Sequence, residues 1–203
     1  GAQALDPVSQ VIAFCGDGGG ADMGLGGISA TLTHKDYNSL ILLYDNESYA
    51  NTDIQVSSQT PYGAVTTFSP TGTDKRLMHT RWKKNMPGMM AVGHPESRYI
   101  AAGCAAYAVD LMNKIRRALE LGGPTFVHTL DPCPKGWDYH PQYSKELGHL
   151  AVVTGIWTLS DVIAAQPGTS DVSATRVDSV NVLLSGTSTT TTTPLQCPKG
   201  LPR

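Results

Sequence analysis

The chain has 203 residues, 40% of them hydrophobic, which is enough to bury the core of one ordinary domain. Its 15 basic and 17 acidic side chains leave a formal charge of −2, so no basic excess favours nucleic acid or an anionic membrane. No apolar run approaches the roughly 20 residues that cross a bilayer and no leader pattern opens the chain, so we expect a cytoplasmic protein without a membrane span.

Two short apolar runs near the start predict neighbouring strands of a parallel sheet. Residues 11–14 precede Gly16-Asp17-Gly18-Gly19-Gly20, and residues 40–44 precede Asp45-Asn46. Continuous apolar runs are typical of parallel strands that helices bury on both faces. The segment 23–32 between them is rich in small residues and predicts a helix, which completes a β-α-β unit.

The middle of the chain predicts a long helix over residues 99–121, because apolar residues recur there at spacings of three and four before Gly122-Gly123. Residues 125–130 predict a further buried strand, and residues 143–154 a further helix. Strands followed by polar loops are the arrangement in which open α/β sheets bind ligands at the strand carboxyl ends. We therefore predict an α/β domain over residues 1–163, with a mostly parallel sheet and helices on both faces.

The segment 164–203 has a different composition, rich in Gly, Ser, Thr and Pro, with a run of threonines at 189–193. This composition predicts a flexible tail. The alternative is that residues 179–184 add one strand to the domain.

The loops after the first two strands predict a site for a metal-bound diphosphate. Such a site needs a carboxylate, neutral oxygen ligands and backbone N–H groups that approach phosphate closely. Asp17 offers the carboxylate, and the glycines around it, Gly16, Gly18 and Gly19, let the backbone turn tightly beside an anion. Asn46 offers a side-chain oxygen. Gly-Asp-Gly alone is compatible with an ordinary loop, and the paired Asn favours the binding site.

These paired motifs resemble the signature of thiamine-diphosphate enzymes, in which Gly-Asp-Gly is followed by a downstream Asn. The continuation Tyr-Asp-Asn-Glu-Ser-Tyr-Ala-Asn-Thr at 44–52 and Thr-Pro-Tyr-Gly-Ala at 60–64 is similar to the β subunit of pyruvate synthase and its 2-oxoacid:ferredoxin relatives. The similarity extends to Lys-Lys-Asn-Met-Pro at 83–87 and Pro-Cys-Pro-Lys-Gly-Trp at 132–137, and covers roughly residues 11–159.

The resemblance implies a thiamine-diphosphate-binding fold of the pyrophosphate type and a role for each matching residue. Asp17 and Asn46 would hold Mg²⁺ with their side chains, and Ser48 with its backbone carbonyl. Asn51 would face the thiazolium and the substrate as the catalytic residue, next to Thr52. The remaining cofactor contacts would come from Gly16, Gly18 and Gly19. The family commonly has Gly where this chain has Asp53, and a carboxylate there would repel an anionic substrate.

The resemblance also implies oxidative decarboxylation of a 2-oxoacid to acyl-coenzyme A and CO₂, with electrons passed through [4Fe–4S] clusters to ferredoxin. Pyruvate is the favoured substrate, and oxalate, 2-oxoglutarate and branched-chain 2-oxoacids remain open. The expected partners are a pyrimidine-binding substrate subunit, a ferredoxin-like subunit, ferredoxin and coenzyme A. Two alternatives remain: a non-redox thiamine-diphosphate decarboxylase subunit, and a catalytically silent assembly module with the same fold.

Cys133 lies between two prolines directly after a predicted strand. From the residues alone, a buried structural cysteine is the favoured interpretation, whereas the resemblance makes Cys133 one ligand of a [4Fe–4S] cluster. The other family ligands lie upstream of the Gly-Asp-Gly loop, so we expect a missing segment or a partner to supply them, unless the cluster has been lost. Cys15 and Cys104 are expected to be core residues, and Cys197 repeats the Cys-Pro-Lys-Gly order by chance.

Arg81, Lys83 and Lys84 form a small basic group in the sequence. A solvated face is the favoured interpretation, and contact with a coenzyme A phosphate or a partner subunit is the alternative. The six histidines lack the spacing of a zinc site and are expected to have ordinary surface or core roles.

Overall fold

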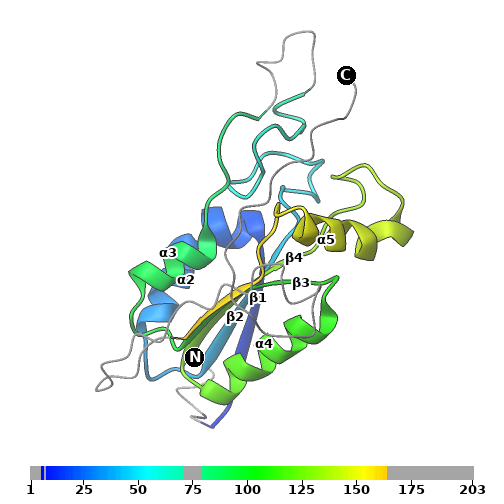
Figure 1. Ribbon diagram of the computed structural model, residues 1–203. Coiled ribbons are helices and arrows are strands. Elements are labelled where there is room, and N and C mark those ends of the chain that lie inside the picture. Colours follow the sequence, from blue (N-terminus) through cyan, green and yellow to red (C-terminus); the bar gives the residue numbers. More distant parts are fainter. Residues whose placement is uncertain (1–5, 7, 71–78, 164–203) are drawn as a thin grey trace, which may run out of the picture.

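A computed structural model of the chain describes residue 6 and residues 8–70 and 79–163 (Figure 1). They form a five-stranded sheet of order β1-β2-β4-β3-β5, in which only β5 runs antiparallel to its neighbour. The predicted mostly parallel sheet is therefore confirmed. The strands are β1 (Val11–Gly16), β2 (Ser39–Asp45), β3 (Tyr99–Cys104), β4 (Pro124–Leu130) and β5 (Ser160–Ile163).

Helices cover both faces of the sheet, as the sequence predicts (Figure 1). The apolar side chains of α2 (Leu25–Thr33) and α3 (Met86–Gly93) pack on one face, where Phe126 is fully buried. The apolar side of α4 (Ala108–Leu121) packs on the opposite face, against Val127. Alternate residues of β4 thus serve two cores, and all seven residues of this strand are buried.

The prediction of one long helix over residues 99–121 is wrong in its first part. Residues Tyr99–Cys104 form β3, all six of them buried, and the helix α4 begins only at Ala108. Alanine and glycine fit a helix or a strand, and the central position between β4 and β5 decides in favour of the strand. Cys104 therefore ends a strand and does not lie on a helix.

Two further details differ from the sequence prediction. The strand β1 is at the edge of the sheet, so it is only partly covered, and Phe14 is 68% exposed. The predicted helix over residues 23–32 begins earlier, as a π-helical turn η1 (Gly18–Met23) that leads into α2.

The predicted helix over residues 143–154 is confirmed as α5 (Ser144–Val153), preceded by the 3-10 turn η3 (Pro141–Tyr143). The segment 164–203, with its possible strand at 179–184, lies outside the described residues.

The register of the sheet brings several polar loops to one edge. Gly16 of β1 pairs with Tyr44 of β2, and Asp45 of β2 pairs with Leu130 of β4, so the loops after all three strands begin at the same level. The backbone N–H of Asp131 donates to the carbonyl of Asp45 at 2.8 Å and joins two of these loops. This carboxyl edge is where parallel sheets bind ligands. Within the described ranges, no helix is long and apolar enough to cross a membrane.

Candidate functional site

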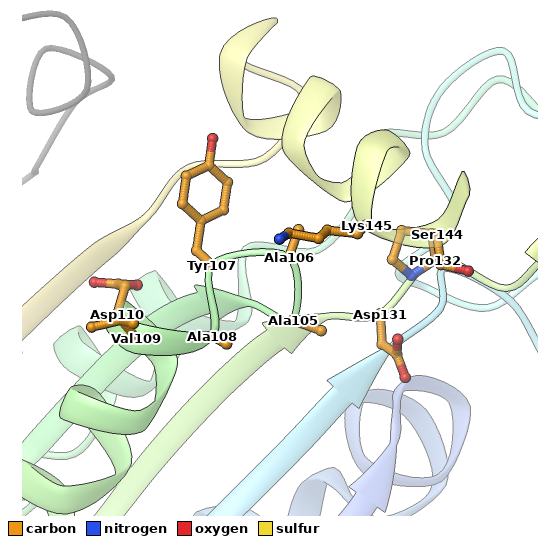
Figure 2. A pocket seen from close by; sticks show the side chains of 10 residues that line it. All are labelled: Ala105, Ala106, Tyr107, Ala108, Val109, Asp110, Asp131, Pro132, Ser144 and Lys145. Carbon is orange, nitrogen blue, oxygen red and sulfur yellow. The ribbon is translucent and has the colours of Figure 1, made fainter. Parts of the chain in front are cut away.

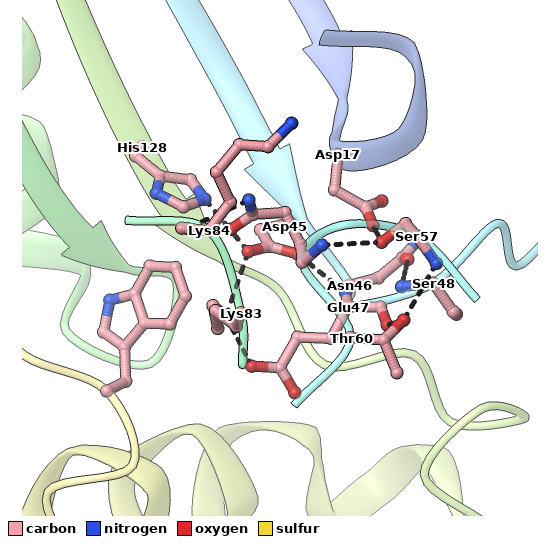
Figure 3. Close-up of polar contacts among 12 residues, drawn as sticks. Asp17, Asp45, Asn46, Glu47, Ser48, Ser57, Thr60, Lys83, Lys84 and His128 are labelled. Carbon is pink, nitrogen blue, oxygen red and sulfur yellow. Dashed lines mark hydrogen bonds and ion pairs between the residues drawn. The ribbon is translucent and has the colours of Figure 1, made fainter. Parts of the chain in front are cut away.

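Asp17 lies at the junction of β1 and η1, and its carboxylate is almost completely buried, with 2% of the residue exposed. The hydroxyl of Ser57 donates a hydrogen bond to it (Figure 3). No basic side chain of the described residues forms an ion pair with Asp17. Burial raises the pKa of Asp17 from 3.8 to about 7, against the opposing effect of the Ser57 hydrogen bond. The site therefore holds a carboxylate that lacks a counter-charge.

The glycines after Asp17 meet different surroundings. A Cβ on Gly18 would lie 2.2 Å from the ring of Tyr49, whose hydroxyl donates to the carbonyl of Gly18 at 3.2 Å. A Cβ on Gly19 would meet nothing within 4 Å, so its backbone is open. The first turn of η1 has no side-chain cap, which leaves backbone N–H groups available to an anion. Gly18 is thus required for packing, and Gly19 for access.

Asn46 and Ser48 lie in the turn that follows β2. The side-chain oxygen of Asn46 accepts a hydrogen bond from the backbone N–H of Ser48 at 3.1 Å. The backbone of Glu47 between them has a φ of 68°, a left-handed conformation that is uncommon for residues other than glycine. Thr60 fixes this conformation, because its hydroxyl donates to the carbonyl of Glu47 at 2.7 Å (Figure 3). Asn46 is therefore presented by a constrained turn.

The residues present fit a hard divalent cation that shares its ligands with a diphosphate. Asp17 provides a buried carboxylate, and Asp45 at the end of the neighbouring strand is close enough that its charge adds to the pKa rise of Asp17. Asn46 is the residue that follows Asp45. The hydroxyl of Ser48 is buried without a hydrogen-bond partner. The described residues contain no group of three or more His, Cys, Asp or Glu side chains suited to a metal. A single carboxylate with neutral oxygens suits Mg²⁺, which takes its other ligands from phosphate and water.

Asn51 and Thr52 lie in an exposed turn beyond Tyr49, where Thr52 bonds Gln55. Asn51 and Thr52 are exposed whereas Asp17 is buried, and their predicted cofactor contacts stay predictions. Asp53 follows with a φ of 85°, a conformation that favours glycine. Its carboxylate accepts from the ammonium of Lys135 at 2.6 Å, so its charge already has a partner.

Cys133 lies in the loop after β4 and is partly buried. Its sulfur accepts a hydrogen bond from the backbone N–H of Gly136 at 3.4 Å. The same loop touches the turn after β2, because the indole of Trp137 donates to the carbonyl of Asn46 at 3.3 Å. Cys133 is therefore next to the candidate site, but the described residues bring no other cysteine into a cluster with it. The two remaining described cysteines, Cys15 and Cys104, contact backbone carbonyls, as expected for core residues.

A buried group of charges beneath the turn after β2 was missed from the sequence. The Nε2 of His128 lies 2.9 Å from the carboxylate of Asp45, and both residues are at most 2% exposed (Figure 3). The ammonium of Lys83 lies 3.2 Å from Asp45 and 2.7 Å from Glu47. The prediction that Lys83 and Lys84 form a solvated face is wrong. A histidine inside a strand predicted to be buried is the signal that could have indicated a buried partner.

The titration behaviour of this group follows from burial and charge. Burial lowers the pKa of His128, so its ring is neutral and donates from Nε2 to the Asp45 carboxylate. Burial opposes ionisation of Asp45, but the His128 hydrogen bond and the Lys83 charge together hold its pKa below the usual range. Burial raises the pKa of Glu47, against the attraction of Lys83. Asp45, unlike Asp17, is therefore a stabilised carboxylate.

A cavity of about 710 Å³ opens at the carboxyl ends of β3 and β4, between the start of α4 and the start of α5 (Figure 2). It extends the same edge of the sheet away from Asp17. Its lining residues are Ala105, Ala106, Tyr107, Ala108, Val109, Asp110, Asp131, Pro132, Ser144 and Lys145.

Residues 1–129 match the family model of the C-terminal TPP-binding domain of thiamine pyrophosphate enzymes. The chain belongs to this family. Pyruvate synthase subunit PorB of Methanothermobacter thermautotrophicus is 45% identical to it over 162 residues, which cover 79% of this chain and 54% of that protein. Ketoisovalerate oxidoreductase subunit VorB of Pyrococcus horikoshii is 38% identical over 150 residues, covering 74% of this chain and 47% of that protein.

A solved structure shows the same arrangement of elements. The 2-oxoglutarate:ferredoxin oxidoreductase from Magnetococcus marinus, with 2-oxoglutarate, coenzyme A and succinyl-CoA bound, matches with a TM-score of 0.58 and 25% sequence identity. The match covers 66% of this chain and 43% of that one. The chain spans about half the length of the curated relatives PorB and VorB that it matches.

Proposed function

We propose that this chain forms the magnesium–diphosphate half of the thiamine diphosphate site in a 2-oxoacid:ferredoxin oxidoreductase. The observation that carries the proposal is the buried carboxylate of Asp17, which pairs with no basic side chain among the described residues. An isolated buried carboxylate is unfavourable, and a hard cation would compensate its charge. Membership of the thiamine pyrophosphate family supports thiamine diphosphate as the ligand that brings this cation.

Each residue of the carboxyl edge then has a role. Asp17 and Asn46 would bind Mg²⁺ through side-chain oxygens, and Ser48 through its backbone carbonyl. The open backbone of Gly19, with Gly16 and Gly18, would approach the diphosphate. These groups bind and orient the cofactor and do not react themselves.

We assign Asn51 to the thiazolium and substrate side of the site, with Thr52 beside it. In support, Asn51 is exposed, and its side chain makes no hydrogen bond within the described residues that would have to break first. When bound, thiamine diphosphate supplies the electron sink for decarboxylation, and the protein orients it and excludes competing reactions. The amide of Asn51 would orient the substrate carboxylate or carbonyl by hydrogen bonding.

The redox half of the proposal rests on Cys133 and on other polypeptides. Cys133 would provide one thiolate of a [4Fe–4S] cluster, with the other ligands coming from outside the described residues. We further propose partner subunits that complete the thiamine site, with ferredoxin as electron acceptor and coenzyme A as acyl acceptor. Pyruvate is the favoured substrate because the pyruvate synthase subunit PorB is 45% identical to this chain, against 38% for VorB. A branched-chain 2-oxoacid and 2-oxoglutarate are the alternatives that the other relatives suggest.

Isothermal calorimetry of the complex purified through a tag on this chain tests the proposal. We expect saturable binding of thiamine diphosphate that requires Mg²⁺ and is lost in Asp17→Asn, while Asp36→Asn, a change at an exposed carboxylate, leaves it intact. Iron bound to the same complex would support the redox reaction over a simple decarboxylase. Absence of cofactor binding in the wild-type complex would overturn the proposal.

A further inference from the structure

Two consecutive lysines, Lys83 and Lys84, lie in the extended segment before α3 and reach two different parts of the candidate site. Their side chains are only 22% and 27% exposed. Both ammonium groups contact carboxylates, and Figure 3 shows the two side chains diverging from the same stretch of backbone. Adjacent side chains of an extended segment point to opposite sides, so one such pair can contact two loops at once.

Lys83 holds the turn after β2. Its ammonium bridges the carboxylates of Asp45, at 3.2 Å, and Glu47, at 2.7 Å, which are the two residues on either side of Asn46. Both carboxylates are almost completely buried, so removal of Lys83 would leave the Glu47 carboxylate without an ion-pair partner among the described residues. The Asp45 carboxylate also accepts the backbone N–H of Glu47 at 2.7 Å. Lys83 therefore stabilises the left-handed turn that presents Asn46.

Lys84 holds η1, the turn that begins beside Asp17. Its ammonium donates to the carbonyl of Ala21 and lies 3.4 Å from the carboxylate of Asp22. The other oxygen of Asp22 accepts from the backbone N–H of Ser58 at 3.0 Å and from the hydroxyl of Tyr49 at 3.2 Å. Lys84 thus completes a polar cluster that fixes η1 against the loop around residue 58.

The backbone of Lys84 connects the same loop to Asp17. Its N–H donates to the carbonyl of Ser58 at 2.9 Å, and its carbonyl accepts from the side chain of Gln59 at 3.1 Å. The neighbouring Ser57 is the residue that bonds the Asp17 carboxylate. The lysine segment, the residue 57–59 loop and both cofactor loops are therefore one connected polar structure.

We propose that Lys83 and Lys84 are positioning residues that set the two halves of the metal–diphosphate site relative to each other. Lys83 acts on residues 45–48, and Lys84 on residues 18–23. We assign neither lysine a direct contact with the cofactor, since each ammonium contacts two protein oxygens. This inference rests on the proposed function, since it assumes that these loops bind Mg²⁺ and thiamine diphosphate.

The test compares Lys83→Met and Lys84→Met with the arginine variants at both positions, in the complex purified through a tag on this chain. Lys35→Met, at an exposed lysine, is the matched control. Hydrogen–deuterium exchange followed by mass spectrometry reports on each loop, and calorimetry reports on binding of thiamine diphosphate with Mg²⁺.

We expect Lys83→Met to increase exchange selectively in residues 45–48, and Lys84→Met in residues 18–23, each with an affinity loss of about tenfold or more. Arginine at either position should restore the affinity to within about threefold, and the control should match wild type. Unchanged exchange in both loops, or an increase spread over the whole domain, would overturn the inference.

If Lys83→Met does not fold, the double variant Glu47→Gln, Lys83→Met removes one buried carboxylate along with the ammonium and replaces it in the test. Wild-type complex that does not bind the cofactor would instead refute the proposed function itself. Wild-type binding with unaltered methionine variants would refute only the positioning role.

Discussion

Asp17→Asn is expected to stabilise the cofactor-free protein at neutral and alkaline pH while abolishing cofactor binding. The carboxylate is 2% exposed, and burial raises its pKa from 3.8 to about 7. The shift is about 3 units, and each unit corresponds to about 1.36 kcal/mol, so the ionised form costs at most about 4 kcal/mol. Asparagine keeps the shape and can still accept the hydrogen bond from Ser57, but it carries no charge.

The sign of the pH dependence follows from proton binding. Between pH 3.8 and about 7 the folded chain keeps the Asp17 proton, whereas the unfolded chain has lost it. The contribution of Asp17 to stability is therefore fully present below pH 3.8 and is lost as the pH rises through 7. The advantage of Asp17→Asn over wild type should grow across this range and level off near pH 8.

Urea unfolding at several pH values between 4.5 and 8 measures this difference without cofactor, with Asp36→Asn as the exposed control. Contributions to the free energy of unfolding that wild type and variant share cancel in the comparison. With Mg²⁺ and thiamine diphosphate at about 100 times the dissociation constant, wild type should gain about 2.7 kcal/mol and the variant nothing. A variant that is less stable than wild type at pH 8, or an advantage that does not change with pH, would refute the reasoning.

Three further substitutions test other parts of the site. Gly18→Ala should destabilise the folded chain by about 1–3 kcal/mol in urea unfolding, because the added Cβ would lie 2.2 Å from the Tyr49 ring. The control Gly26→Ala lies on α2, where an added Cβ meets nothing within 4 Å, and should be neutral or slightly stabilising. Cys133→Ser should leave calorimetric cofactor binding intact and lower the iron content of the assembled complex, and unchanged iron would exclude it as a ligand. Asp53→Gly should change stability by less than about 1 kcal/mol, because glycine adopts the φ of 85° without strain and this gain offsets the loss of an exposed ion pair with Lys135. A larger loss of stability would mean that this ion pair contributes more than its exposure suggests.

The position of the site was predictable because it depends on where apolar runs end. Residues that follow parallel strands must share one edge of the sheet, so Asp17 and Asn46 could be brought together from the sequence alone. The secondary structure of residues 99–104 was not predictable in the same way. The alanines in this stretch suit a helix, and only the neighbouring strands β4 and β5, which no local pattern reveals, make it an interior strand of the sheet.

The supporting charges could not be read from local patterns either. Lys83 follows Asp45 by almost forty residues, and a lysine pair in a loop is most often solvated. The edge position of β1 was missed for a similar reason, because an apolar strand sequence does not state how many neighbours it has. These features depend on long-range packing, whereas the positions of Asp17 and Asn46 at the strand ends depend on the order of short segments.

Asp17 and Asp45 lie at the same edge of the sheet but differ in their partners, which suits Asp17 to bind a cation and Asp45 to stabilise the fold. Both carboxylates are buried at the ends of adjacent strands, but Asp45 contacts Lys83 and His128, whereas the donors to Asp17 among the described residues are a hydroxyl and backbone N–H groups. Burial of an uncompensated charge is costly, which is why we propose that the Asp17 position binds an external cation. The same cost makes the cofactor-free site less stable, and binding of Mg²⁺ with the diphosphate would recover that stability. If Asp17 binds the cation, we therefore expect coupling between folding and cofactor binding, because no basic side chain of the described residues pairs with Asp17.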